Sequence, residues 1–127
     1  MSNIRVLQVF YASAAVAHVL VIAKIIPYSW VNGGMSDSYQ EQMIQSVSSL
    51  VVLGLLFLFV RHMSKPKVQV KFWQRLALKL ITAFWVIGFM LQLLGTPFER
   101  YVLSITLAIG VIGHAQLIRS FRTHIKA

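Results

Sequence analysis

Four long apolar runs limit the fold of this chain more than any other feature. They cover Val6–Ile26, Met43–Val60, Leu76–Leu94 and Tyr101–Ile118. A helix needs about 20 apolar residues to cross the hydrocarbon of a bilayer, and the two shorter runs can span a slightly thinned bilayer. The composition, 57% hydrophobic and 12% charged, also differs strongly from that of a soluble domain. We therefore expect an all-α, four-helix transmembrane bundle that forms a single domain over residues 1–127.

Basic residues are divided unequally between the two sides of such a bundle. Only Lys24 and Arg100 fall on the side that also carries all three acids, Asp37, Glu41 and Glu99. Because basic loops stay in the cytoplasm, we expect an up-down bundle with both termini inside, in the cytoplasmic membrane. The other ten basic residues lie on this predicted inner side: Arg5, Arg61, Lys65, Lys67, Lys71, Arg75, Lys79, Arg119, Arg122 and Lys126.

The formal net charge of +9 therefore follows from topology and from attraction to anionic lipid. We expect the lipid bilayer as a partner and no nucleic acid. The chain has no cysteine, which excludes disulfides, thiolate nucleophiles and cysteine-ligated metal sites.

The segment between the third and fourth runs has the pattern of a very tight outer turn. Gly95 is a helix stop, Thr96 an N-cap, Pro97 the first helical residue and Glu99 the third. That order predicts a capping box with proline at its favoured site. The last two helices should therefore be antiparallel neighbours.

Two further signals predict helix ends on the outer side. Ser38-x-x-Glu41 is typical of a capping box that opens the second span. Pro27 disfavours helix in the residue before it, so the first span should end near Ile26.

The outer loop between these two helices, residues 27–37, is longer than most connections in helix bundles. Pro27, Tyr28 and Trp30 are typical of an interfacial aromatic belt, and Asn32-Gly33-Gly34 is a turn signal. Two interpretations stay open. The loop is either a belt plus a turn, or a segment that folds over the bundle mouth and helps to form a site.

The string Ile26-Pro27-Tyr28-x-Trp30-x-Asn32-Gly33-Gly34, with His18 before it and Gly95-x-Pro97-Phe98-Glu99 after it, resembles a known family. Its members are small, functionally uncharacterised four-span bacterial integral membrane proteins with an outer loop of the Ile-Pro-Tyr / Trp-Gly-Gly type. This chain departs from the pattern because Asn32 stands between Trp30 and the glycine pair, and because Gln45 stands where relatives carry an acid. The resemblance implies the four-span layout and no activity.

Polar groups inside the spans are costly, so each needs a partner or a purpose. At 1.5 Å per residue, His18, Ser49, Gly88 and Ser104 fall at about the same depth in the outer half. Helical spacing also puts Trp85 on one stripe with Phe89 and Gln92, and Ser49 on one stripe with Gln42 and Gln45. If both stripes face inward, the outer half contains a ligand-binding pocket. Its expected residues are His18, Gln45, Ser49, Trp85, Gln92 and, in the loop that roofs it, Trp30.

A second interpretation needs no pocket. Serine and glutamine side chains often join membrane helices by hydrogen bonds that contribute about 0.6 kcal/mol each. The sequence does not distinguish packing of this kind from a site.

His114 should lie nearer the inner end, level with Tyr11, and we expect a hydrogen bond between the two. Haem with His18 and His114 as axial ligands is disfavoured, because their depths differ by about 10 Å. We expect no cofactor, no metal site and no catalytic residue. Gly110 and Gly113 permit close helix approach, either within the bundle or in a homodimer.

Four functions are weighed against these patterns. The first is a binding protein that holds a small or lipid-like ligand, or a partner membrane helix, in its outer half. The second is a small transporter or channel, formed by a single chain or by a dimer, although no acid lies within a predicted span. An enzyme with His18 as acid–base and Glu99 or Glu41 as helper is less favoured, because no nucleophile or metal motif accompanies it. A membrane assembly or immunity-type accessory role is the remaining alternative.

Overall fold

The computed structural model describes the backbone of residues 3–66 and 69–125. Lys67, Lys126 and the side chain of Arg122, which enter the charge count above, lie outside the described part. The elements are α1 (Asn3–Ile22), 3-10 turns at Tyr28–Trp30 and Asn32–Gly34, α2 (Tyr39–Met63), α3 (Phe72–Leu94), a π-turn at Glu99–Leu103 and α4 (Ser104–Ile125).

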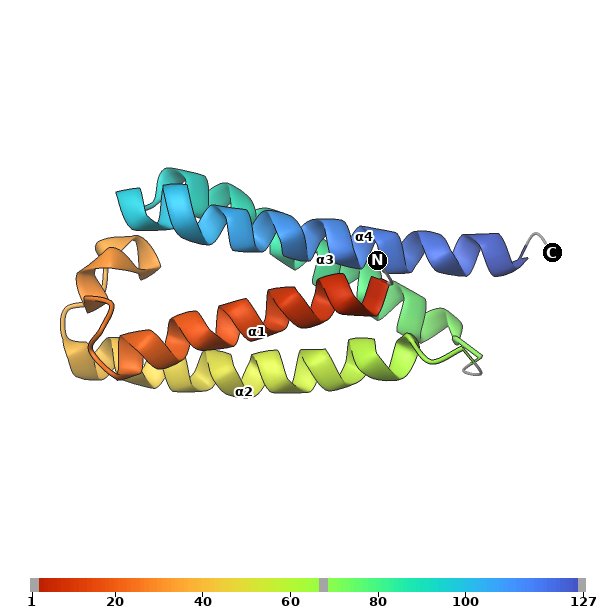
Figure 1. Cartoon of the computed structure of the whole chain (residues 1–127), viewed down its shortest axis with the longest axis horizontal. Coiled ribbons are helices and arrows are strands. Elements are labelled where there is room, and N and C mark those ends of the chain that lie inside the picture. The colour runs from red at the N-terminus through yellow and green to blue at the C-terminus, as the bar shows by residue number, and fades with distance from the viewer. Residues whose placement is uncertain (1–2, 67–68, 126–127) are drawn as a thin grey trace.

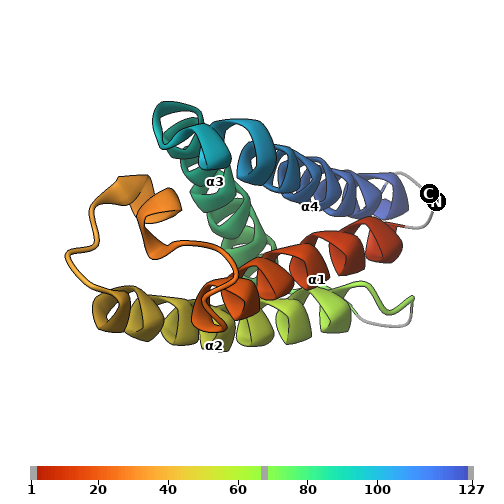
Figure 2. The same cartoon turned by 60° about the vertical axis from the view of Figure 1, so that its left-hand side comes forward.

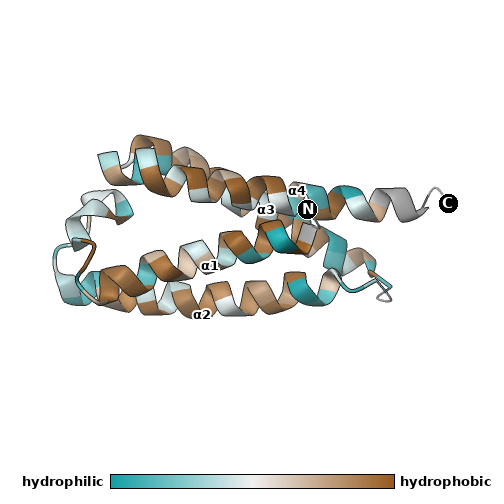
Figure 3. Cartoon of the chain, viewed as in Figure 1, coloured by the Kyte–Doolittle hydropathy of each residue, from teal (hydrophilic) through white to brown (hydrophobic). Residues whose placement is uncertain are grey.

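The helices confirm the predicted fold class. In the described residues, four helices are long and apolar enough to cross a membrane. Apolar residues fill most of their length, whereas hydrophilic residues gather near the ends and in the loops (Figure 3). The chain is therefore a small, all-α, multi-pass membrane protein.

The helices run up and down, and both termini lie at one end of the bundle (Figure 1). We call this the inner end and the opposite end, with residues 23–38 and the 95–98 turn, the outer end. This naming follows the predicted orientation, which stays a prediction. α1 packs against α2 and α4, and α4 packs against α3, whereas α2 and α3 do not form such a pair in the described chain. Figure 2 shows α2 and α3 diverging toward the outer end, where the loop lies between them.

The packed core lies in the inner half. Phe10 is fully buried and contacts the rings of Tyr11 and Trp85 with centroid distances of 4.8 and 5.0 Å. Gly110 makes room for it, since a Cβ there would lie 2.5 Å from the Phe10 ring. The core also includes Leu7, Leu53, Val60, Met63, Leu78 and Leu117.

His114 is fully buried in this core and the predicted bond to Tyr11 is confirmed. Nδ1 of His114 lies 2.6 Å from the carbonyl oxygen of Gly110, and Nε2 lies 2.9 Å from the Tyr11 hydroxyl. A carbonyl only accepts, so in a neutral ring Nδ1 donates to Gly110 and Nε2 accepts from Tyr11. Both ring nitrogens are thus satisfied.

The glycines of α4 face α1. A Cβ on Gly113 would lie 3.1 Å from side-chain atoms of Val6 and Leu7. Gly110 and Gly113 therefore permit close packing inside the bundle, which was one of the two alternatives open from sequence.

The predicted end of the first span at Ile26 is wrong, because α1 ends at Ile22. Lys24 adopts a left-handed φ of 62°, and the N–H of Ile25 donates to the carbonyl of Leu20 at 2.9 Å. This left-handed residue with a bond back across the last turn is a Schellman motif. It stops the helix before the chain reaches the proline.

The start of α2 confirms half of the predicted capping box. Ser38 Oγ accepts from the N–H of Glu41 at 3.2 Å. The reciprocal bond is replaced, because the Glu41 carboxylate accepts from the N–H of Asp37 at 2.9 Å. The hydroxyl of Tyr39 donates to the carbonyl of Ile22 and thereby joins the start of α2 to the end of α1.

The turn between α3 and α4 confirms the second predicted box. The N–H of Thr96 donates to Glu99 Oε2 at 2.8 Å, and the N–H of Glu99 donates to Thr96 Oγ1 at 3.3 Å. Helix follows from Pro97, first as the short π-turn and then as α4.

Candidate ligand cavity

A cavity of about 520 Å³ lies in the outer half of the bundle, between α2 and α3 and against α1 and α4. Pockets for small molecules commonly measure about 300–1,000 Å³. The cavity therefore has the size of a small-molecule site, and it occupies the region where α2 and α3 diverge.

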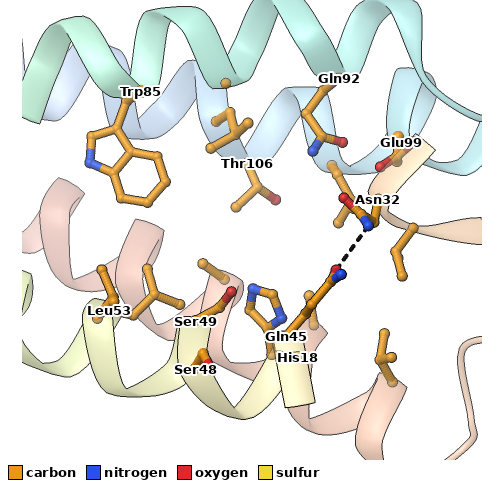
Figure 4. Close-up of a pocket in the computed structure, with 18 of the residues that line it drawn as sticks. His18, Asn32, Gln45, Ser48, Ser49, Leu53, Trp85, Gln92, Glu99 and Thr106 are labelled. Atoms are coloured by element: carbon orange, nitrogen blue, oxygen red, sulfur yellow. Dashed lines mark hydrogen bonds between the residues drawn. The ribbon is translucent and has the colours of Figure 1, made fainter. Parts of the chain in front are cut away.

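The lining of the cavity changes character along the bundle axis (Figure 4). Trp85 and Leu53 lie at its inner end, whereas Asn32, Gln92 and Glu99 lie at its outer end. An amphipathic molecule has this same division between apolar and polar parts. The polar lining residues are His18, Asn32, Gln42, Gln45, Ser48, Ser49, Gln92, Glu99 and Thr106.

His18 projects from α1 into the middle of the cavity, close to Ser49 of α2 (Figure 4). It is half-buried, and neither ring nitrogen makes a hydrogen bond to another described residue. Oε1 of Gln92 is buried and is also without a partner among the described residues. Buried polar atoms in native proteins are nearly always hydrogen-bonded, so these groups are available to water or to a ligand.

The outer loop covers the outer end of the cavity. Val31 and Asn32 are part of the lining. Asn32 has a left-handed φ of 54°, and its Nδ2 donates to Gln45 Oε1 at 2.8 Å and to Ser36 Oγ at 3.3 Å. Asparagine tolerates this conformation better than most residues. The amide of Asn32 therefore joins the loop to α2 at the edge of the cavity.

Glu99 joins the same loop to the start of the fourth span. Its side chain is only 2% exposed, and the N–H of Gly33 donates to both carboxylate oxygens, at 3.0 and 3.1 Å. The N–H of Thr96 adds a third bond, and the hydroxyl of Thr96 donates to the carbonyl of Trp30. No ion pair to Glu99 forms among the described side chains. Backbone N–H groups alone stabilise this buried acid.

Gly95 is required for this arrangement. A Cβ at that position would lie 2.2 Å from Glu99 Oε2. The helix-stop residue that the sequence identified therefore also leaves space for the carboxylate.

Five of the six residues predicted for the site line the cavity: His18, Gln45, Ser49, Trp85 and Gln92. Trp30 does not. Its ring is 49% exposed and packs against Phe98 with a centroid distance of 5.6 Å, so only its backbone takes part in the roof. Ser104, expected at the same depth, instead donates to the carbonyl of Arg100 within its own helix. Ligand binding by these residues stays a prediction.

The loop that carries Trp30 was the expected roof of the pocket, but neither Asn32 nor Glu99 was named among the site residues. Asn32 was treated as a turn residue and Glu99 as a helix cap or as the helper in a disfavoured enzyme, and each also lines the cavity. The usable signal for Asn32 was its position before the glycine pair of a long loop. Thr106 was missed because a lone threonine in an apolar helix is usual.

The geometry gives no support to acid–base catalysis by His18. Glu99 bonds to Gly33 and Thr96, Glu41 bonds to Asp37, and neither carboxylate bonds to His18. Within residues 3–66 and 69–125, no three His, Asp or Glu side chains converge as metal ligands would.

Comparison with known proteins adds no family. No protein-family model, curated protein or solved structure matches this chain. The resemblance to four-span bacterial proteins with an Ile-Pro-Tyr / Trp-Gly-Gly loop stays a proposal.

Proposed function

We propose that this small membrane protein binds a small or lipid-like molecule in the cavity of its outer half. The observation that carries the proposal is a cavity of about 520 Å³ in which His18 and the Oε1 of Gln92 have no partner in the described chain. A dry interior would leave these groups unsatisfied at a cost of about 1–3 kcal/mol each.

The loop supports this proposal because it is organised around the cavity. Bonds from Asn32 to Gln45, and from Gly33 to Glu99, connect one segment to both walls of the mouth. An open belt of aromatic residues would need neither bond. The arrangement is expected of a roof that separates a bound molecule from water.

The alternative of a transporter or channel is less favoured by the inner half. Below the cavity, the buried rings of Phe10, Tyr11 and His114 contact one another and form an aromatic layer toward the inner end. Transport would require this layer to separate. A partner membrane helix, a homodimer and an accessory role in assembly or immunity stay alternatives that no contact in the described chain favours.

Mass spectrometry of the purified protein tests the proposal with a matched pair of variants. Gly88 lines the cavity and a Cβ there meets only Leu107, at 3.6 Å, so the ring of Gly88→Phe would fill the space. Gly54 has nothing within 4 Å of a Cβ, so Gly54→Phe adds the same ring on an open face.

We expect a co-purified molecule with the wild type and Gly54→Phe, and its loss from Gly88→Phe. Equal retention by Gly88→Phe and Gly54→Phe would place the molecule on the outside of the bundle and contradict the proposal.

A further inference from the structure

We infer that the ligand is an amphiphile with an uncharged, hydrogen-bonding head and an apolar chain, and that it enters from the bilayer between α2 and α3. This inference rests on the proposed function and adds the chemical class of the ligand and its route.

The charges of the lining disfavour an anionic head. Among the described residues, no lysine or arginine lines the cavity, and Glu99 is the one acid in the lining. A phosphate or carboxylate placed at the outer end would face the Glu99 carboxylate without any cation to compensate. Burying an unpaired charge costs far more than burying a neutral polar group.

A cationic head is disfavoured for a different reason. Both oxygens of Glu99 already accept bonds from Gly33, and Oε2 accepts a third from Thr96. An ammonium group would find most of the acceptor sites of this acid occupied, because three of the roughly four lone pairs already accept backbone bonds. The charge of Glu99 is thus already stabilised from the protein side.

Neutral groups match the remaining polar atoms well. The free Oε1 of Gln92 accepts, the ring of His18 has one donor and one acceptor when neutral, and the hydroxyls of Ser49 and Thr106 make no bond to another described residue. Hydroxyl groups of a ligand both donate and accept, so they can satisfy this mixed set. A glycerol or similar head is the chemistry that the outer end selects.

The side of the cavity between α2 and α3 indicates how a ligand enters. The loop covers the outer end, whereas α2 and α3 leave the cavity without a close helix pair on that side. Val52 of α2 and Phe84 of α3 line the cavity and are 49% and 58% exposed. In a membrane this side meets lipid chains. A molecule can therefore place its head in the cavity while its chain lies along Trp85 or extends between α2 and α3.

Three amphiphiles with the same oleoyl or oleyl chain test the inference: monoolein, oleoyl lysophosphatidic acid and oleylamine. Binding to the detergent-purified wild type is titrated by native mass spectrometry, with Gly88→Phe and Gly54→Phe in parallel. We expect saturable binding of monoolein that is about ten-fold or more tighter than that of either charged probe. We also expect Gly88→Phe, but not Gly54→Phe, to abolish it.

The polar contacts are tested by Gln92→Leu, which should weaken monoolein binding by about three- to ten-fold. Unchanged affinity in this variant would contradict the position of the head. Tighter binding of either charged probe than of monoolein would overturn the inference about the head and leave the proposed function standing. Absence of saturable binding for all three probes, together with an empty purified protein, would overturn the proposed function itself.

Discussion

His114 in the inner half of this bundle and His18 in the outer half lie in opposite surroundings. His114 is 0% exposed and uses both ring nitrogens, toward Tyr11 and Gly110, inside a packed aromatic core. His18 is half-buried and faces a cavity with no bond to a described residue. The same side chain thus stabilises the fold in one half and stays available for binding in the other.

The difference arises from the helix arrangement. In the inner half, Gly110 and Gly113 let α1 approach α4 closely, and aromatic rings fill the interior. In the outer half α2 and α3 diverge. The end of the bundle is closed there by a loop, not by packed side chains. Stability should therefore depend mainly on inner residues, and ligand retention on outer ones.

Replacing each histidine by alanine, in separate variants, should give the largest difference in stability between the two halves. His114→Ala removes two hydrogen bonds and leaves a void in the core, so we expect a loss of about 2–4 kcal/mol in the free energy of unfolding. His18→Ala should change that free energy by less than about 1 kcal/mol and should lower ligand retention. Unfolding in mixed micelles with rising sodium dodecyl sulfate measures the free energy of unfolding of both variants. Equal losses in the two variants would remove the distinction between the halves.

Adding a methyl group to the glycines tests the packing of the inner half. Gly110→Ala would place a Cβ 2.5 Å from the Phe10 ring, so we expect a loss of about 1–3 kcal/mol. Gly54→Ala, where a Cβ meets nothing within 4 Å, is the control and should not lower stability. The same micelle titration serves here. A tolerated Gly110→Ala would show that α1 and α4 are not closely packed.

The turn between α3 and α4 should contribute less to stability than the packed core of the inner half. Thr96→Ala removes the N-cap of the fourth span and the bond to the Trp30 carbonyl, with an expected cost of about 1 kcal/mol. Thr82→Ala, which loses only a bond to Leu78 within its own helix, should be near neutral. Coinciding unfolding midpoints of the two variants would show that Thr96 does not stabilise the turn as a cap.

Labelling of single cysteines shows which end of the bundle faces the outside of the cell. Met35 is 74% exposed at the outer end, and Lys65 is exposed at the inner end. A membrane-impermeant thiol reagent added to intact cells should label Met35→Cys and leave Lys65→Cys unlabelled. The reverse pattern would invert the predicted orientation.

The sequence was sufficient for the fold and for much of the cavity wall. Apolar runs and basic loops are properties of single segments, so they predicted four spans and an up-down order. Equal depth and helical spacing brought His18, Ser49 and Gln92 together, because depth is fixed by the rise of a helix.

Two features depended on interactions that local patterns do not contain. The Schellman end of α1 requires a lysine in a left-handed conformation, which residue type does not predict. The joining of Gly33 to Glu99 connects residues 66 positions apart, and nothing in either segment indicates the other. For the same reason Trp30 was assigned to the lining although its ring points elsewhere.

Thiol reactivity distinguishes an outer half that encloses an accessible cavity from one that is closed. The chain has no native cysteine, so single cysteines can be placed as probes. Ser49→Cys reports on the cavity and Ser46→Cys on a fully buried site. Gly54→Cys reports on the exposed side of α2 that faces away from the bundle. Thiolates, which form in a hydrated site, attack thiosulfonate reagents and displace sulfinate. In delipidated protein we expect the cysteine at position 49 to react fastest and to be slowed by added monoolein, while those at 46 and 54 stay slow. A position-49 thiol as unreactive as that at position 46 would show that the outer half is closed and would contradict the account.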